Sequence, residues 1–556
     1  MTSSGFRDPR RSELLDRRRF LYLIGVLGGA GLAASCTRAA SDADVLASTS
    51  PRGAGAAPTN DVLVVRGKMV LRNSRSVAGV VIEPGGELTF HPGRSVTLRS
   101  TGNIVVRGRL TMRPRDARTL HRIVFTGVNE SEFVGGGMDV LDSDVGLWVM
   151  DRGRLDVNGS PKRAWSRAAG SVAAGATTVE LEHDPVGWRT GDEIAIAPTG
   201  QASGGSEGQF DLVTVAAVNG RSVRLRQGTS FAHPSVPTGE GPTFTAEVMN
   251  LTRNVRFEGT PGGRSHIFIR SARSQRIAHA AVRHMAPGTL GRYGVHFHHA
   301  ENGSRRSVVQ GVVVRDAGGH AFVPHWSHGV SFRECISYDT ADVAYWWDLA
   351  DATHDTLYQS CIAAIVHAGQ DGGQRLSAFS LNRGSGNTAR GCVAVGVEGD
   401  RSASGYHWPE DSESDGTGIW TFVDNVAHNN RVNGIFVWQN DENRHVVDRF
   451  TAYRNGAFGI EHGAYFNRYE YRGALLVDNG EGGVMDHARS VQGTTPVLFE
   501  RFVIEGSPVG FLEGAINDNA IQNPPAVVCS PTFRNVGRNV VDGDLGTPTF
   551  DVRTNC

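Results

Sequence analysis

Apolar and polar residues alternate along most of this chain, in short runs that turn residues separate. The segment 61–112 contains VLVVRG, GVVIEPGGELTF, SVTLRS and NIVVRGRLTM. A period of two is typical of β-strands that turn one face to a core, and the Pro-Gly and Gly-Gly pairs between the runs indicate tight turns. The segment shows no helical period of any length. The pattern therefore predicts an all-β protein.

Similar runs recur through the rest of the chain at a nearly constant spacing. Asp316 and Asp339 are 23 residues apart, and Asn430, Asn455 and Asn479 follow one another at steps of 25 and 24 residues. Repeats this short, with no helix between the strands, predict a right-handed parallel β-helix. Because Asn before Gly favours a left-handed turn residue, we expect Asn455 and Asn479 to adopt that conformation at the coil corners.

The repeats can be aligned on one another. Matching RDAGGHAFVPH to YDTADVAYWWD places Phe322 over Tyr345 and His325 over Asp348, and matching RYGVHFH to the same template places His298 over His325. Neighbouring strands of a sheet lie about 4.8 Å apart. We therefore expect His298, His325 and Asp348 to form one column on three successive coils.

A different pattern interrupts the coils. The segment 177–199, TTVELEHDPVGWRTGDEIAIAPT, predicts the strands of a small β-barrel or sandwich, in which Trp188 is a core or interface aromatic. The predicted organisation is a signal segment, a tether, an N-terminal β region, a linking region with this insert, and a long run of coils. Their bounds are 1–36, 37–59, 60–150, 151–250 and 251–556.

The first residues carry an export signal. Arg17, Arg18 and Arg19 precede a short apolar run that ends in LAASC, at Cys36. A twin-arginine pair before such a run predicts export by the twin-arginine route, and the last residues resemble a lipobox whose cysteine is acylated. We expect a cell-surface lipoprotein, held to the membrane by its lipid alone, or a secreted protein. An uncleaved membrane anchor is the alternative.

Composition adds two constraints. Glycine makes up 70 of the 556 residues, which favours many tight turns, and the formal net charge of −1 gives no indication of nucleic acid as a partner. Cys335, Cys361 and Cys392 begin similar phrases and are expected to stack as buried thiols. Cys529 and Cys556 can pair near the C-terminus, a question that spacing leaves open.

Histidines supply the candidate chemistry. In GVHFHH, strand alternation sends His296 and His298 to one side and Phe297 to the other. A buried, hydrogen-bonded histidine is the ordinary explanation for any one of them, but histidine also serves as an acid, a base or a metal ligand near neutral pH. The candidate catalytic residues are Tyr293, His296, His298, His325 and Asp348.

Several phrases together resemble a known family, the cell-migration-inducing and transmembrane hyaluronidases, over roughly residues 60–450. The N-terminal phrase EPGGELTF is similar to the family's G-eight domain, and GRLDVNGSPKRAWSR and GWRTGDEIAIAPT are similar to its linking region. HMAPGTLGRYGVHFHH, SHGV, YDTADVAY and AFSLNRGSGNTARGCVAVG are similar to its β-helix. The positions that match the family's motifs are Arg292, Tyr293, His296, His298, His325 and His328.

The resemblance implies depolymerisation of a uronic-acid-containing glycosaminoglycan, outside the cell and with Ca²⁺. A stripe of aromatic and polar residues along the coils would suit an anionic polysaccharide. The predicted substrate-binding residues are Arg292, His328, Trp346, Trp347, Asn382, Arg383, Tyr406, His407 and Trp408. The acidic phrase HWPEDSESDG offers Glu410, Asp411 and Glu413 as oxygen ligands for Ca²⁺, although a solvated acidic loop is the ordinary explanation for it.

Two reactions and one non-catalytic function remain open. β-Elimination needs a base and a cation beside the uronate, whereas hydrolysis needs two carboxylates about 5 to 10 Å apart. The many histidines and few acids in the predicted column favour elimination. The alternative to an enzyme is a surface-anchored β-helix that only binds carbohydrate, because this fold serves both roles.

Overall fold

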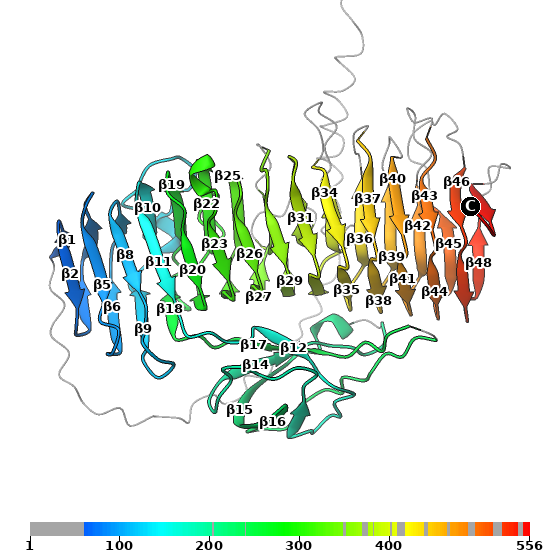
Figure 1. Ribbon diagram of the computed structural model, residues 1–556, viewed down its shortest axis with the longest axis horizontal. Helices are drawn as coiled ribbons and strands as arrows, with labels where there is room; N and C mark the ends of the chain where they lie inside the picture. Colours follow the sequence, from blue (N-terminus) through cyan, green and yellow to red (C-terminus); the bar gives the residue numbers. More distant parts are fainter. Residues whose placement is uncertain are drawn as a thin grey trace, which may run out of the picture. The chain divides into compact units, whose positions relative to one another are not determined.

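The computed structural model describes residues 61–202, 205–239, 241–347, 352–369, 376–381, 383–400, 403–408, 418–438, 443–463, 468–487, 495–514, 525–542 and 549–556. Within these ranges the protein is built from β-strands, with three single-turn 3₁₀ helices, η1 (Glu130–Glu132), η2 (Ser206–Gly208) and η3 (Asn302–Ser304). The coils stack along one axis (Figure 1). The prediction of an all-β parallel β-helix is confirmed.

Three long parallel sheets form the sides of the coils. One sheet has 15 strands, from β2 (Lys68–Leu71) to β49 (Phe550–Arg553), and another has 14, from β3 (Arg75–Val77) to β47 (Thr532–Arg534). The third side consists of two seven-stranded runs, and we call it the split sheet. Its first run contains β1 (Val62–Val65), β4 (Gly79–Ile82), β7 (Ile104–Val106), β10 (Leu147–Asp151), β19 (Ile267–Ser271), β22 (Val295–Glu301) and β25 (Phe322–Ser327). Its second run contains β30 (Ser377–Ser380), β33 (Ser404–Trp408), β36 (Asn433–Trp438), β39 (Phe458–Gly463), β42 (Gly482–Asp486), β45 (Val509–Glu513) and β48 (Arg538–Val541).

Tyr345 links the two runs of the split sheet. It forms single parallel bridges to Phe322 on one side and Phe379 on the other. The three rings stack inside the coils, and Tyr406 extends the stack, with successive centroids 4.9, 4.4 and 5.1 Å apart. The predicted register of Phe322 over Tyr345 is confirmed.

The coil corners hold a ladder of buried amides. The side-chain nitrogen of Asn430 donates to the side-chain oxygen of Asn455, and Asn455 donates likewise to Asn479, each over 2.9 Å. The predicted left-handed conformation at Asn455 and Asn479 is wrong, since it falls one residue earlier, on Arg454 and Asp478, both with φ of 53°. The asparagines turn inward because each amide satisfies its neighbours and a backbone carbonyl within the core.

The insert forms a separate antiparallel sheet. Its six strands are β12 (Trp165–Arg167), β17 (Glu247–Asn250), β14 (Glu193–Ile196), β15 (Asp211–Asn219), β16 (Ser222–Leu225) and β13 (Thr178–Glu180). Trp188 lies in its core, as predicted. The coils continue across the insertion, because β10 before it pairs in parallel with β19 after it. Glu247 docks the insert on the 14-stranded sheet, accepting from His428 over 3.0 Å and from Arg167 over 3.1 Å.

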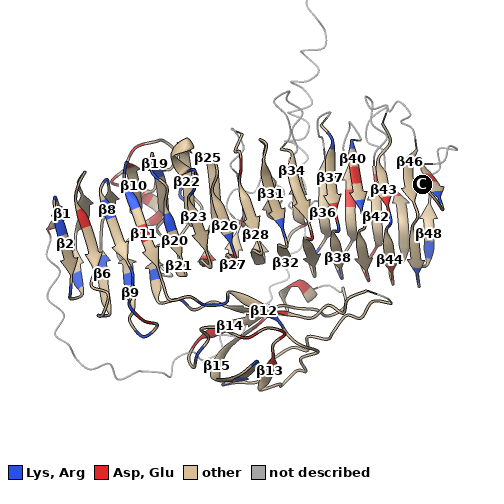
Figure 2. Cartoon of the chain, viewed as in Figure 1, with Lys and Arg blue, Asp and Glu red and all other residues tan. Residues whose placement is uncertain are grey.

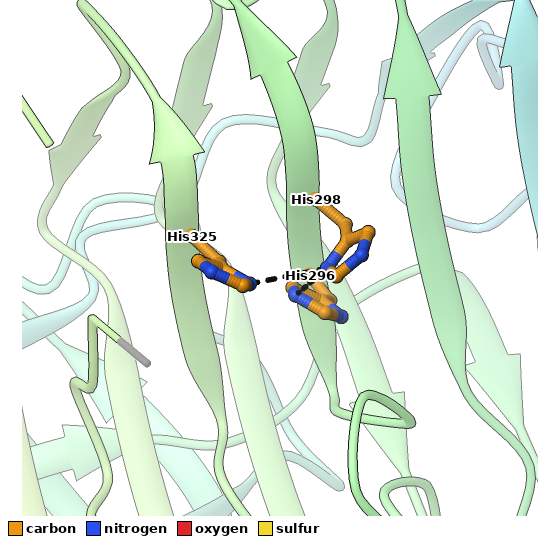
Figure 3. Close-up of side chains that lie close together, drawn as sticks. All are labelled: His296, His298 and His325. Carbon is orange, nitrogen blue, oxygen red and sulfur yellow. Dashed lines mark hydrogen bonds between the residues drawn. The ribbon is translucent and has the colours of Figure 1, made fainter. Parts of the chain in front are cut away.

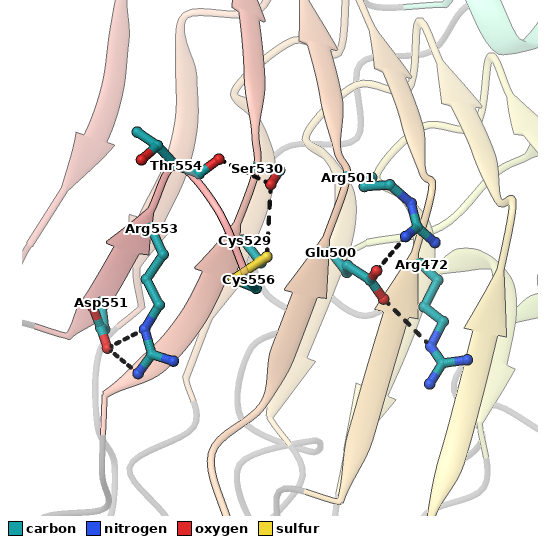
Figure 4. Close-up of a disulfide and its surroundings, with 9 residues drawn as sticks. All are labelled: Arg472, Glu500, Arg501, Cys529, Ser530, Asp551, Arg553, Thr554 and Cys556. Atoms are coloured by element: carbon teal, nitrogen blue, oxygen red, sulfur yellow. Dashed lines mark hydrogen bonds and ion pairs between the residues drawn. A yellow bond between two sulfur atoms is a disulfide. The ribbon is translucent and has the colours of Figure 1, made fainter.

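The cysteines follow the sequence expectations. Cys335, Cys361 and Cys392 are buried free thiols in successive coils, and Cys529 forms a disulfide with Cys556 that holds the last strand (Figure 4). Charged residues of both signs are spread along the coils (Figure 2). Among the described residues, no helix has the length and apolar character needed to cross a membrane.

Candidate functional site

Three histidines converge on the outer face of the split sheet. In β22, Val295 and Phe297 point into the core. Because successive side chains of a strand alternate between its two faces, His296 and His298 point outward. His298 is paired with His325 of β25 in the parallel register, as predicted from the repeats. Figure 3 shows the three imidazoles turned toward one another, and we call them the histidine trio.

Close nitrogen contacts join the trio. His298 Nδ1 lies 3.2 Å from His296 Nε2 and 3.2 Å from His325 Nδ1. All three side chains are buried, with exposed fractions of 0% for His296, 8% for His298 and 6% for His325. The ring of Phe268, from the preceding coil, lies 4.8 Å from that of His298 and 5.5 Å from that of His296. The trio is therefore packed against aromatic rings rather than exposed to solvent.

The backbone beside the trio is strained. His299 and Trp326, the residues that directly follow His298 and His325, have φ of 44° and 40°. The strand register shifts between His298 and Glu301, which marks a β-bulge. Positive φ in such bulky residues is uncommon and costly, and it concentrates at functional sites, where bulges also re-aim side chains. The bulge and these two residues thus bend both strands directly after His298 and His325.

Burial lowers the pKa of two members of the trio, His296 and His298. Burial, followed by the charges of His298 and His325, holds the pKa of His296 well below its usual value. Burial and the neighbouring histidines and arginines lower the pKa of His298 to about 2. His298 is therefore neutral across the physiological range, with a lone pair available, and is a weak general base because efficient bases have a pKa near the working pH.

Arg292 supports the trio from behind. Its side chain is fully buried and donates to Asp144 Oδ2 over 2.6 Å, to the carbonyl of Gly136 over 2.7 Å and to the carbonyl of Gly291 over 3.2 Å. The same Gly291 carbonyl accepts from His296 Nδ1 over 3.0 Å. The prediction that Arg292 binds the substrate is wrong, because its donors already hold the loop that orients His296.

Sequence reasoning missed two residues at this site. Asp144 neutralises Arg292 from a position 148 residues earlier, in a loop without any repeat signal. Arg270 follows Ile269, the register partner of Phe297, so it stands level with His298 on the outer face, and its charge contributes to the low pKa of His298. Among the described residues the Nε–H of Arg270 has no hydrogen-bond partner. Only the alignment of β19 with β22 could have shown that Arg270 is a neighbour.

The predicted aromatic platforms beside the trio are covered. Trp346 stacks on His320 with ring centroids 3.9 Å apart and meets Tyr293 edge-on, and the indole nitrogen of Trp347 donates to Ser380. Tyr293, Trp346 and Trp347 form one small buried cluster. Trp346 and Trp347 are therefore packing residues in this structure, which corrects their prediction as exposed sugar-stacking residues. Tyr293 contacts the ring of His296 and stays a catalytic candidate.

Tyr406 and Trp408 lie inside the coils. Tyr406 belongs to the central aromatic stack, and Trp408 packs against Phe422 and Tyr469 in the same core. Both are fully buried. Their predicted contact with substrate is wrong, because in β33 the alternation turns these two side chains inward and His407 outward.

Three further predictions concern partly exposed residues. His328 packs beside His354, with ring centroids 5.0 Å apart, and Arg383 pairs its backbone with Thr353. His407 lies on the outer face of the second run of the split sheet, beside Phe436. The structure neither joins these residues to the trio nor covers them, so their substrate-binding roles stay predictions.

The remaining predicted site residues lie outside the described residues. They are Cys36, Asp348, Asn382, Glu410, Asp411 and Glu413.

One part of the chain matches a known domain family. The family model for the G8 domain matches residues 49–169. The resemblance to a G8-containing, CEMIP-like family is confirmed by this match and by relatives of low identity. Within the described part of the match, the G8 segment forms the first coils of the β-helix and leads into the insert.

The chain is similar to short parts of much longer proteins. It is 24% identical to the human cell surface hyaluronidase CEMIP2 over 207 residues, which cover 33% of this chain and 15% of that protein. It is 23% identical to fibrocystin of Canis lupus familiaris over 458 residues, which cover 76% of this chain and 10% of that protein. It is 26% identical to mouse fibrocystin-L over 39% of this chain and 5% of that protein. The chain thus spans a small part of the length of these relatives.

Two solved structures align with this chain over most of its length. The catalytic domain of a GH87 alpha-1,3-glucanase in complex with tetrasaccharides aligns with a TM-score of 0.42 and 10% identity, covering 70% of this chain and 90% of that chain. The tailspike protein gp49 from Pseudomonas phage LKA1 aligns with a TM-score of 0.24 and 13% identity, covering 86% and 72%.

Proposed function

We propose that this protein is an exported enzyme that degrades a uronic-acid-containing, glycosaminoglycan-like polysaccharide at the histidine trio. The observation that carries the proposal is the convergence of three buried imidazoles beside a strained bulge. Buried ionisable groups with shifted pKa values, held in a strained backbone, are typical of reaction centres. The name of the human relative, a cell surface hyaluronidase, supports the class of substrate.

Arg270 supplies the charge that a uronate requires. It stands beside His298 in the adjacent strand β19, and its buried Nε–H has no hydrogen-bond partner among the described residues. A guanidinium binds a carboxylate through paired, charge-assisted hydrogen bonds. We therefore assign to Arg270 the substrate-binding role that the sequence had suggested for Arg292.

β-Elimination is the reaction that fits the described site. Tyr293 or a histidine of the trio takes the C5 proton of the uronate, the bond between C4 and the glycosidic oxygen breaks, and another of these groups gives its proton to the leaving oxygen. The products are a new reducing end and a C4–C5 unsaturated uronate. Neutralising the carboxylate makes the C5 proton more acidic, which is the part that Arg270 plays. Hydrolysis needs a pair of carboxylates, whereas the described neighbours of the trio are histidines, arginines and aromatic rings.

The setting of the enzyme belongs to the same proposal. Export by the twin-arginine route and acylation at Cys36 place it at the cell surface, held to the membrane by lipid alone or released. The partner is an anionic polysaccharide. Asp348 remains a catalytic candidate from the repeat register, and Glu410, Asp411 and Glu413 remain candidate ligands for Ca²⁺.

Product analysis tests the proposal. The purified chain is incubated with hyaluronan, chondroitin and pectin, with and without EDTA, while reducing ends and the ultraviolet absorbance of unsaturated uronate are both recorded. We expect the two signals to rise together on at least one polymer. Reducing ends without absorbance would replace elimination by hydrolysis. Retention on immobilised polymer without any product, across a panel of surface glycans, would favour the non-catalytic carbohydrate-binding function.

A further inference from the structure

We propose that His296, His298 and His325 bind one divalent transition-metal ion of the Zn²⁺ class, with a coordination position left for water or a ligand. One nitrogen of each side chain lies within 4.8 Å of the other two. In the part of the chain that the structure describes, this is the one set of three His, Cys, Asp or Glu side chains that converges in this way. The inference does not depend on the proposed function, because metal binding can be measured without any substrate.

The nitrogen distances suit a tetrahedral ion. With Zn–N bonds of about 2.0–2.1 Å, two ligands of a tetrahedron are separated by about 3.3 Å. The two contacts of His298 Nδ1 are both 3.2 Å long. The nitrogens of His296 and His325 are farther apart, within the 4.8 Å limit, so an ion would draw these two rings toward each other. His325 projects from the strand adjacent to that of His298, at the same register position.

The hydrogen bonding behind His296 fixes the required tautomer. A carbonyl oxygen only accepts, so His296 Nδ1 must carry the hydrogen that it donates to Gly291. In the neutral ring the lone pair then lies on Nε2, the atom that faces His298. Metal-ligating histidines characteristically donate their other ring N–H to a carbonyl or carboxylate, which orients the ligand. Gly291 is held in turn by Arg292 and, through it, by Asp144.

Without an ion, hydrogen bonds cannot satisfy all the ring nitrogens that face one another in the histidine trio. His298 Nδ1 faces two nitrogens at once, and His296 Nε2 is already an acceptor. A single hydrogen on His298 Nδ1 would have to be shared between both neighbours. One cation at the centre would instead receive a lone pair from each ring. The ion would also supply a bound water of lowered pKa at this site.

The donor set selects the kind of metal. Three imidazole nitrogens suit Zn²⁺ and its neighbours in the first transition row, whereas Ca²⁺ takes oxygen ligands. Phe268 and Trp148 pack against each other and line this face, which keeps the surroundings apolar. The site is therefore different in chemistry from the Ca²⁺ site expected at Glu410, Asp411 and Glu413.

Direct binding measurements test the inference. The untagged, full-length chain is stripped with a chelator, dialysed and titrated with Zn²⁺ alone by calorimetry, and with Co²⁺ while its visible absorption is recorded. We expect one equivalent of either ion, a Co²⁺ spectrum typical of nitrogen ligation, and no displacement by excess Ca²⁺. Failure of the unsubstituted chain to retain one equivalent would overturn the proposal without recourse to any variant.

Variants locate the ion. His298→Ala and the more conservative His325→Gln should each weaken Zn²⁺ binding by more than about 100-fold, beyond the usual effect of losing an outer-shell partner. The matched control is His183→Ala, which removes an exposed histidine of the insert, and it should bind as the parent does. Circular dichroism verifies that each variant keeps its β-structure. Equal affinity in a folded His298→Ala or His325→Gln and in His183→Ala would refute the site.

Discussion

His298 and His325 face each other across two adjacent parallel strands, with their Nδ1 atoms 3.2 Å apart and their Cα atoms in register. Each is followed by a residue in the left-handed region of φ, His299 and Trp326 respectively. Two coils thus place the same side chain at the same level and then bend in the same way.

Removing either member of this pair should abolish turnover and leave the fold intact. Both side chains lie on the outer face, so His298→Ala and His325→Ala leave the core stack unchanged. We expect a fall in kcat of about 10²- to 10⁴-fold, the range that a positioned catalytic group contributes. The measurement is the initial rate on the cleaved polymer, with His183→Ala as the control. Parental rates in both folded variants would rule out the trio as the reaction centre.

Arg270 should determine the affinity for a carboxylated substrate. Arg270→Ala removes charge-assisted hydrogen bonds worth about 1.5–3 kcal/mol, so we expect KM to rise roughly ten- to hundredfold. The control is Arg273→Ala, an exposed arginine in the turn that follows β19. Comparing each polymer with its carboxyl-reduced form separates recognition of the carboxylate from a general loss of binding. An unchanged KM for the carboxylated polymer would remove Arg270 from the site.

The buried ion pair of Asp144 and Arg292 should support both stability and the trio. Asp144→Ala leaves the guanidinium of Arg292 buried without its partner, which costs about 3–5 kcal/mol. The Gly291 carbonyl then loses its fixed position, so Zn²⁺ affinity should fall about 10- to 100-fold. Thermal unfolding and calorimetry measure the two effects. Asp142→Ala, an exposed position in the same loop, is the control, and equal melting temperatures in the two variants would contradict this account.

Docking of the insert should weaken at acid pH, because Glu247 loses its charge there. Burial alone would raise the pKa of Glu247, but the charge and hydrogen bond of His428, together with Arg167, lower it to about 2. A carboxyl with a lowered pKa stabilises the fold above its unfolded value of 4.5, and this contribution disappears as the pH falls from 4.5 toward 2. At about 1.4 kcal/mol per pKa unit, the contribution is about 3 kcal/mol.

Glu247→Gln should therefore lower the melting temperature at pH 7 and flatten its dependence on pH between 4.5 and 2. The control is Glu180→Gln, which changes an exposed carboxyl of the same insert. Melting curves at several pH values supply the comparison. If Glu247→Gln keeps the parental pH dependence in this range, the acid sensitivity resides elsewhere.

The repeat pattern alone was sufficient to predict the coils and one pair of the site. Alternation fixes which side chains leave the core, and the spacing of the repeats fixes which strands are neighbours, so His298 could be matched to His325 from the amino-acid sequence. The same reasoning predicted that Phe322 lies over Tyr345 and that Cys335, Cys361 and Cys392 lie in successive coils. These features are local or periodic, and hydrophobic periodicity is the signal that sequence carries best.

Tertiary structure decided what lies around that pair. Alternation gives the direction of a side chain relative to its strand, but not whether loops from other coils cover it. Trp346 and Trp347 were therefore candidates for substrate binding with an inward direction left open for each, and both proved to be packed. Arg292 was assigned to the substrate because nothing near it in the chain reveals that Asp144, 148 residues earlier, is its partner. Arg270 became visible only as a neighbour of His298 across the sheet. The shared centre of His296, His298 and His325 is likewise a property of three rings in space, because the ring rotamers and the bulge at His299 set the distances that sequence spacing leaves free.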